Sequence, residues 1–220
     1  MGIEAVLFDA DGVLQRPTVR WRQAFELLLG TTDAAIIDGF VRDVVAAELP
    51  ALSVSMGFED ALALVLDRWN CSGRLADALR VLTAIEVYDE VMGAVQSLRL
   101  SGVACHLATN QQAHRARHMS EVMGYCSLFD RESYSCYLGV AKPDVQYFAA
   151  ILRELDLPGQ SVLFLDDCEV NVAGARRAGL LAAVYDGAGG VSALRRALIE
   201  FGLEVRQCGA HAIPPPGASG

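Results

Sequence analysis

The stretch IEAVLFDADGV, residues 3–13, decides the class of fold. Its first part is an almost continuous apolar run that ends at Asp9, which is the pattern of a strand buried on both faces of a sheet. Similar short runs recur at residues 103–109, 161–166 and 180–185. Helical patterns lie between them, as at residues 89–102 and 142–155. Strands that alternate with helices predict an α/β fold, in which helices cover both sides of a parallel sheet.

One long segment interrupts this alternation. From about Gln15 to Glu86 the sequence has helical patterns only. We therefore interpret residues 15–86 as an inserted helical subdomain and residues 1–14 and 87–207 as the core that carries the sheet. Residues 208–220 have no hydrophobic period and are rich in proline and glycine, which predicts a mobile tail.

The composition is that of a soluble globular protein. The chain has 220 residues, of which 53% are hydrophobic, and its net charge of −9 argues against nucleic acid or an anionic membrane as a partner. Six cysteines lie scattered without a CxxC pair, as expected for reduced thiols in the cytoplasm. No signal peptide and no apolar stretch of the ~18 residues needed to span a membrane is evident. We expect a cytoplasmic protein, whose oligomeric state the sequence does not predict.

Polar residues follow the predicted strands where the chain leaves the sheet. Ligands of an open parallel sheet bind beyond the carboxyl ends of its strands. The only lysine of the chain opens the helical pattern of residues 142–155 and is expected at the same edge. The residues that meet there are Asp9, Asp11, Thr109, Asn110, Lys142, Asp166 and Asp167.

The carboxylates at this edge need a cation. Each like-charged pair ~4 Å apart costs roughly 1 kcal/mol in water and about 4 kcal/mol at an effective dielectric constant of 20. Oxygen ligands select a hard divalent ion, and Mg2+ suits a few carboxylates together with waters and a substrate phosphate. Thr109, Asn110 and Lys142 offer a hydroxyl, an amide and an ammonium to the phosphate oxygens. The sequence thus predicts a phosphoryl-transfer site.

Four motifs occur in the order of a known family. They are DADGV (9–13), LATN (107–110), GVAKPD (139–144) and FLDDCEVN (164–171). The chain resembles the haloacid dehalogenase-like hydrolase superfamily, which has a Rossmann-like core, and its helical insertion is similar to the C1-type cap of that superfamily. The dehalogenases lack the second aspartate of the first motif, so Asp11 favours phosphate over halide chemistry.

The resemblance implies a role for each site residue. Asp9 is the nucleophile that forms an aspartyl-phosphate, and Asp11 protonates the leaving oxygen and then deprotonates the attacking water. Mg2+ is held by the Asp9 carboxylate, the Asp11 backbone carbonyl and Asp167, with Asp166 as a second ligand or an orienting neighbour. Asn171 is expected to orient these acids.

These roles predict a Mg2+-dependent phosphomonoester hydrolase. Its substrate would be a small phosphorylated metabolite, because a helical lid favours small molecules, and sugar phosphates, phosphoglycolate and nucleotides remain open. A phosphomutase with the same motifs, or a non-catalytic binding protein on the same fold, are the alternatives. His114 and His118, four residues apart, are interpreted as part of a solvated helix face rather than a metal site.

Overall fold

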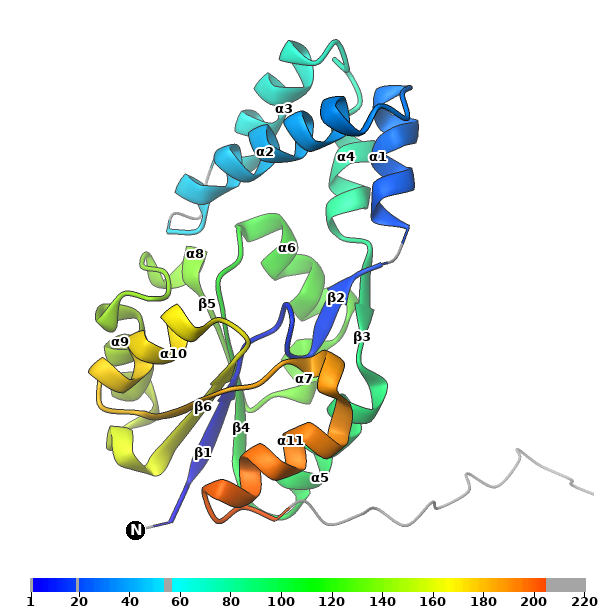
Figure 1. Cartoon of the computed structure of the whole chain (residues 1–220). Coiled ribbons are helices and arrows are strands. Elements are labelled where there is room, and N and C mark those ends of the chain that lie inside the picture. Colours follow the sequence, from blue (N-terminus) through cyan, green and yellow to red (C-terminus); the bar gives the residue numbers. More distant parts are fainter. Residues whose placement is uncertain (1, 19, 54–56, 205–220) are drawn as a thin grey trace, which may run out of the picture.

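A parallel sheet forms the lower half of the computed structural model, which describes residues 2–18, 20–53 and 57–204 (Figure 1). Its strand order is β5–β4–β1–β6–β7, with each neighbouring pair parallel. The strands are β1 (Ala5–Phe8), β4 (Ala104–Thr109), β5 (Arg131–Tyr134), β6 (Val162–Asp166) and β7 (Leu181–Val184). The α/β fold predicted from the sequence is confirmed.

β1 is the central strand because its side chains are apolar on both faces. Ala5 pairs with Ala104 of β4 and with Val162 of β6, and all of β1 is fully buried. Alternate residues serve opposite faces of a strand. Val6 and Phe8 accordingly join one hydrophobic cluster, whereas Ala5 and Leu7 join another.

Helices cover both of these faces. The cluster around Val6 and Phe8 includes residues of α5 (Asp89–Leu100), α6 (Ala113–Arg117), the π-helical turn η1 (His118–Val122), α7 (Tyr125–Leu128) and α11 (Gly190–Glu200). The cluster around Ala5 and Leu7 includes residues of α9 (Val145–Leu155) and α10 (Glu169–Arg177). Short turns complete the connections: α8 (Ser135–Leu138), η2 (Gly159–Ser161) and η3 (Gly187–Gly189).

β5 is an edge strand that the sequence did not reveal. Its residues read RESY, so it lacks the apolar run that marks the other strands. It pairs with β4 on one side only, and Arg131 at its start is exposed. Polar and charged side chains are typical of sheet edges, where they discourage pairing with other molecules.

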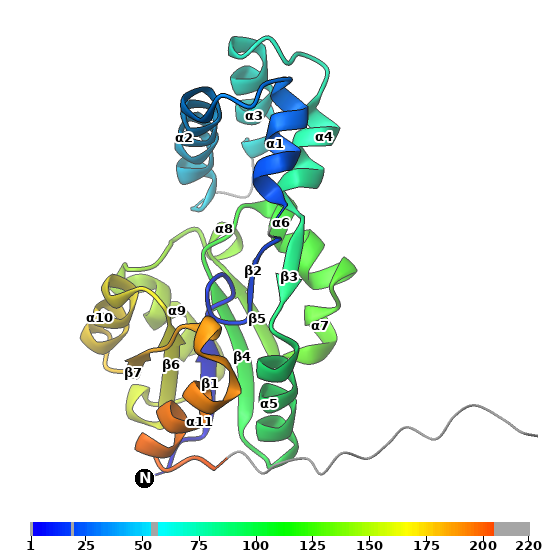
Figure 2. The same cartoon turned by 45° about the vertical axis from the view of Figure 1, so that its right-hand side comes forward.

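A helical unit stands above the carboxyl ends of the strands (Figures 1 and 2). Its helices are α1 (Trp21–Leu29), α2 (Ala34–Ala51), α3 (Phe58–Arg68) and α4 (Leu75–Leu82). They share a hydrophobic cluster separate from those of the sheet. Within it, Phe40 packs edge-to-face against Phe25 and Trp69, with ring centroids 5.6 and 5.9 Å apart. The unit therefore has a core of its own.

Two short strands join this unit to the sheet. β2 (Gln15–Pro17) and β3 (Ile85–Val87) pair antiparallel, with Gln15 opposite Val87 and Pro17 opposite Ile85. Figure 2 shows them side by side between the core and the helical unit. Only helices were expected from about Gln15 to Glu86, and strands this short leave no periodicity to detect. We propose residues 15–86 as the cap and residues 1–14 and 87–207 as the core; the tail predicted for residues 208–220 lies outside the described residues.

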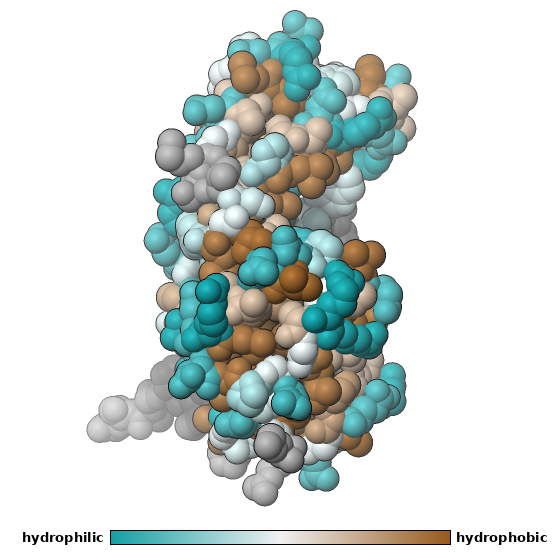
Figure 3. Space-filling view, turned by 90° about the vertical axis from the view of Figure 1, so that its left-hand side faces the viewer, coloured by the Kyte–Doolittle hydropathy of each residue, from teal (hydrophilic) through white to brown (hydrophobic). Residues whose placement is uncertain are grey.

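The surface view shows two lobes with a narrower waist between them (Figure 3). Hydrophilic residues cover much of both lobes, and hydrophobic residues show between them in patches. Among the described helices, none combines the length and the apolar character that crossing a bilayer requires. The described cysteines are all free thiols, as expected from their spacing.

Candidate active site

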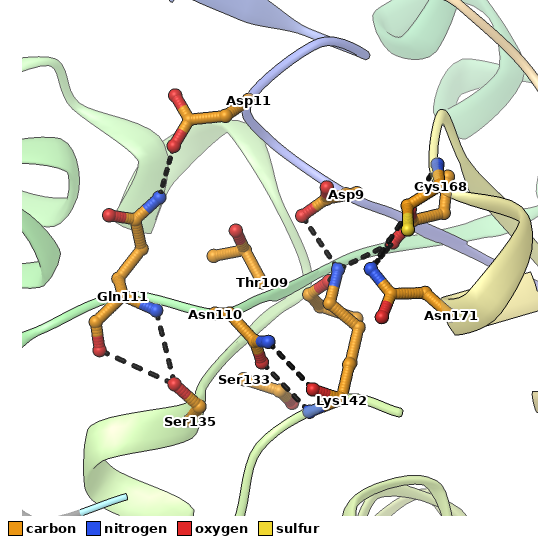
Figure 4. A network of polar contacts seen from close by, with 12 residues as sticks. Asp9, Asp11, Thr109, Asn110, Gln111, Ser133, Ser135, Lys142, Cys168 and Asn171 are labelled. Carbon is orange, nitrogen blue, oxygen red and sulfur yellow. Dashed lines mark hydrogen bonds and ion pairs between the residues drawn. The ribbon is translucent and has the colours of Figure 1, made fainter. Parts of the chain in front are cut away.

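The neighbouring strands β4, β1 and β6 bring the predicted site residues together (Figure 4). Asp9 directly follows β1, Thr109 ends β4 and Asp166 ends β6. Lys142 reaches them from the segment that precedes α9. Its Nζ lies 2.8 Å from Oδ1 of Asp9 and 2.6 Å from Oδ2 of Asp166.

Lys142 is enclosed in the core. Its side chain is only 1% exposed, and its Nζ lies 5.1 Å from the centre of the Phe164 ring. A third hydrogen bond of 3.0 Å goes to the backbone carbonyl of Ala108. Burial acts to lower the pKa of Lys142, but the two aspartates outweigh it and raise the pKa. All three ammonium donors are therefore directed at protein oxygens, and the charge of Lys142 balances the carboxylates.

Asp9, Asp166 and Asp167 form a cluster suited to a metal ion. One carboxylate oxygen of each lies within 4.8 Å of those of the other two. Burial raises the pKa of Asp9 to about 6; Asp166 also raises it, and Lys142 opposes the shift. Burial, followed by the charge of Asp166, likewise raises the pKa of Asp167. Crowded oxygen ligands of this kind fit a hard divalent cation, whose charge would favour their ionised forms.

Gly12 allows the loop after β1 to approach Asp167. Its φ of 83° lies in the left-handed region, which glycine adopts without strain. A Cβ atom at this position would come within 2.1 Å of Oδ2 of Asp167. The DADG turn therefore needs glycine both for its backbone and for the close packing of the first motif against the fourth.

Asn110 holds the backbone of Lys142. Its Nδ2 donates to the Lys142 carbonyl at 2.9 Å, and its Oδ1 accepts the Lys142 N–H at 2.8 Å. The sequence predicts that Asn110 binds phosphate; in the structure both polar atoms of its side chain bond the backbone of Lys142. The following helix begins at Val145, after Asp144 caps it by accepting the Gln146 N–H at 2.9 Å, so Lys142 precedes the helix rather than opening it.

Asp166 is held by protein donors. Besides Lys142, it accepts the Cys168 N–H at 2.8 Å, and Nδ2 of Asn171 lies 3.1 Å from both of its carboxylate oxygens. Asn171 thus contacts the acids, as its spacing suggested. Asp167, by contrast, is exposed. The two neighbouring acids therefore differ, since Asp166 is fixed and buried whereas Asp167 faces the open side of the cluster.

Asp11 is turned away from Asp9, toward Gln111 (Figure 4). Nη2 of Arg115 lies 2.7 and 3.0 Å from its two carboxylate oxygens. Gln111 and Gln15 donate to it at 2.7 and 2.9 Å. These contacts hold the Asp11 carboxylate away from Asp9. Thr109, in contrast, points toward the space between Asp9 and Asp11 in the same view.

Comparison with known proteins identifies the family. A family model described as haloacid dehalogenase-like hydrolase matches residues 3–179. The chain belongs to this family. The resemblance seen in the sequence is thereby confirmed.

Relatives of this haloacid dehalogenase-like hydrolase include named phosphatases. Phosphatase MT3486 of Mycobacterium tuberculosis (strain CDC 1551 / Oshkosh) is 28% identical over 200 residues, which cover 86% of this chain and 90% of that protein.

Solved structures resemble the whole fold. A HAD family enzyme of Bacteroides thetaiotaomicron, in complex with magnesium and inorganic phosphate, has a TM-score of 0.67 at 16% identity and covers 88% of this chain and 99% of its own. L-2-haloacid dehalogenase of Xanthobacter autotrophicus has a TM-score of 0.65 at 22% identity and covers 90% of this chain and 83% of its own. At these identities the likeness shows a shared fold.

Sequence reasoning on this haloacid dehalogenase-like hydrolase missed part of the site. Gln15, Gln111 and Arg115 were not singled out, although Gln111 and Arg115 follow the second motif within a few residues. The two histidines His114 and His118, which were interpreted as part of a solvated helix face, lie on the same stretch. Nδ1 of His114 lies 3.3 Å from Oε1 of Glu59 in α3, which is a solvent-exposed contact with the helical unit.

Proposed function

We propose that the protein is a Mg2+-dependent phosphomonoester hydrolase that acts on a small phosphorylated metabolite through an aspartyl-phosphate. The observation that carries the proposal is the buried Asp9 carboxylate, held by Lys142 at 2.8 Å beside Asp166 and Asp167. The family match and the phosphatase of Mycobacterium tuberculosis support it. So does the fold shared with a structure that contains magnesium and inorganic phosphate.

The carboxylates of Asp9 and Asp167, with the backbone carbonyl of Asp11, are the proposed ligands of Mg2+. Asp166 orients the group, because its oxygens already accept hydrogen bonds from Lys142, Cys168 and Asn171. When bound, Mg2+ supplies positive charge that stabilises the phosphoryl group in transfer. Lys142 keeps Asp9 ionised and in place for attack.

In the first step an Asp9 oxygen attacks the phosphorus atom. The new O–P bond forms as the bond to the leaving alcohol oxygen breaks, and Asp11 donates the proton that this oxygen needs. In the second step Asp11 takes a proton from water, and the water oxygen attacks the aspartyl-phosphate. The products are inorganic phosphate and free Asp9. Thr109 is the proposed hydroxyl donor to the phosphate in both steps.

Asp11 has to turn for these steps. In the structure it is held by Arg115, Gln15 and Gln111. We assign this position to the resting enzyme and the turned position to catalysis. Asp11 enters the first step protonated, and the proton that it takes from water in the second step restores this form for the next turnover.

Phosphate release tests the proposal. Purified protein with Mg2+ should release phosphate steadily from an aryl phosphate and from members of a metabolite panel. The Asp9→Asn variant, which retains the shape of the site but has no nucleophile, is the matched control and should release none. Release by the variant equal to that of the natural protein, or no release by either, would reject the proposal.

A further inference from the structure

An apolar pocket lies between the helical unit and the strands that join it to the sheet. Its volume is about 220 Å³. The helices α1, α2 and α4 and the ends of β2 and β3 contribute its walls. The apolar lining residues are Pro17, Trp21, Phe25, Val41, Val44, Val45, Val81, Leu82, Ala84 and Ile85.

Arg115 links the pocket to the candidate active site. This residue lines the pocket, and its Nη2 lies 2.7 Å from Oδ1 of Asp11. Asp11 is the group proposed to protonate the leaving alcohol. A substrate whose phosphate meets Asp9 would therefore extend its alcohol part past Asp11 and Arg115 toward the pocket.

The lining offers little to a polar molecule. Its charged members are Glu48 and Arg115, and the remaining side chains have no hydrogen-bonding group except the indole N–H of Trp21. A sugar or ribose in this pocket would lose hydrogen bonds to water at several hydroxyls and find few partners, which is unfavourable. A hydrocarbon loses nothing polar and gains from burial.

The charged pair at the pocket also disfavours a second anionic group. Burial raises the pKa of Glu48, and the charge of Arg115 opposes the shift, which indicates that the two residues act on each other. Arg115 is already engaged by Asp11. A second carboxylate or phosphate on the substrate would lie near Glu48, and the only cation in this lining, Arg115, already pairs with Asp11.

We propose that this pocket binds the alcohol part of the substrate and that this part is a hydrocarbon, as in an alkyl or branched aliphatic monophosphate. The inference rests on the proposed phosphohydrolase function and names its substrate class. The volume of about 220 Å³ limits the length of hydrocarbon chain that the pocket can enclose.

Turnover of a homologous series tests this proposal. With Mg2+ present, kcat/KM is measured for n-alkyl monophosphates from ethyl to decyl, and for glycerol phosphate and glucose 6-phosphate. A buried methylene is worth about 0.8 kcal/mol, which corresponds to about fourfold in kcat/KM. We expect kcat/KM to rise about fourfold per methylene, to level off once the chain fills the pocket, and to be lowest for the two polyhydroxylated substrates. A flat series, or a preference for glucose 6-phosphate, would overturn the proposal.

Paired variants localise the effect. Val45 lines the pocket and is 47% exposed, whereas Ile36, near the start of the same helix, is 41% exposed and lies outside the pocket. Val45→Asp should lower the ratio of heptyl to ethyl phosphate turnover at least tenfold, and Ile36→Asp should leave this ratio unchanged. Melting temperatures of both variants establish that the fold is retained. Equal ratios in the two variants would remove the pocket from substrate recognition.

Binding without chemistry separates this proposal from the proposed function. Heptan-1-ol, which has no phosphate, should change the fluorescence of Trp21 in the pocket with saturation, and Val45→Asp should weaken this binding at least tenfold. If no phosphate ester is hydrolysed but the alcohol binds, the proposed function fails and the pocket proposal stands. Hydrolysis with neither chain-length preference nor alcohol binding would reject the pocket proposal alone.

Discussion

Lys142→Met should destabilise the metal-free protein strongly and in a pH-dependent way. The side chain is 1% exposed and lies 2.8 and 2.6 Å from two buried carboxylates, so its removal leaves Asp9 and Asp166 uncompensated. Breaking a buried ion pair by removing one partner costs about 3–5 kcal/mol. For a chain of this size 1 kcal/mol corresponds to roughly 2–4 °C, so the melting temperature should fall by roughly 10 °C.

The loss should depend on pH because the remaining carboxylates can take up protons. The pKa of Asp9 is already raised to about 6 with Lys142 present, and removal of the ammonium raises it further. At pH 8 the variant must either keep two buried negative charges or bind a proton, which is unfavourable at this low proton concentration. At pH 5 protonation is easier. The difference in melting temperature from the natural protein should therefore be large at pH 8 and small at pH 5.

Lys142→Arg separates charge from geometry. Three oxygen atoms lie within 3.0 Å of the single Nζ atom, but a guanidinium spreads its donors over three nitrogens in one plane. The arginine keeps the charge, so we expect a smaller loss of stability than in Lys142→Met. It must displace Asp9, and a misplacement of ~1 Å can cost about 100-fold in rate. Activity should therefore fall at least 100-fold, nearly as far as in Lys142→Ala.

The assays are thermal melting in EDTA at pH 5 and 8, and phosphate release with Mg2+ at pH 7. Arg153→Met is the matched control, because Arg153 is exposed and its side chain donates to the Ala149 carbonyl of its own helix. This control should change neither quantity appreciably. Two results would contradict these predictions: a melting temperature of Lys142→Met equal to that of the natural protein at pH 8, or phosphate release by Lys142→Arg within tenfold of the natural rate.

The other proposed catalytic and metal-binding residues give further predictions. Asp9→Asn should abolish phosphate release while folding normally. Burial raises the pKa of Asp9 from 3.8 to about 6, so the ionised carboxylate of the natural protein costs stability as the pH rises from 4 to 7. The melting temperature of the variant relative to the natural protein, measured in EDTA, should therefore increase over that range, and a constant difference would contradict the raised pKa. Asp11→Asn should slow an alkyl phosphate at least tenfold more than an aryl phosphate, whose phenolate leaves without a proton, and equal losses would remove Asp11 from the acid role. EDTA should stop phosphate release, and Mg2+ should restore it better than Ca2+. The Asp167→Ala variant should need at least tenfold more Mg2+ for the same activity. Undiminished activity in EDTA would show that the carboxylate cluster does not act through a metal.

The sheet could be predicted because burial leaves a strong mark on sequence. A strand buried on both faces is mainly apolar, and the polar residues in β1, β4 and β6 are His106, Thr109 and Asp166 only. The positions of Asp9, Thr109 and Asp166 follow, because a parallel sheet gathers the carboxyl ends of its strands at one edge. β5 escaped notice since an edge strand has no such requirement, and its RESY sequence resembles a loop.

The contacts around Asp11 could not be predicted in the same way. Arg115 and Gln111 lie about a hundred residues away along the chain, and no periodicity relates them to the first motif. Asn110 is a similar case, because its side-chain amide can form hydrogen bonds with a phosphate or with the backbone. Its partner, the backbone of Lys142, can be identified only from the structure. The pocket was hidden for another reason: residues such as Val41 and Val44 fit the helical hydrophobic period whether they pack in a core or line a cavity.

The junction formed by β2 and β3 makes the helical unit a replaceable part. The chain leaves at Pro17 and returns at Ile85 directly opposite, and paired strands lie about 4.8 Å apart, a gap that a two-residue Asn-Gly turn closes. A chain joined in this way would keep the five-stranded sheet and Asp9 but lack the helical unit that stands above them. The helical unit can therefore be exchanged without changing the residues at the carboxyl ends of the strands.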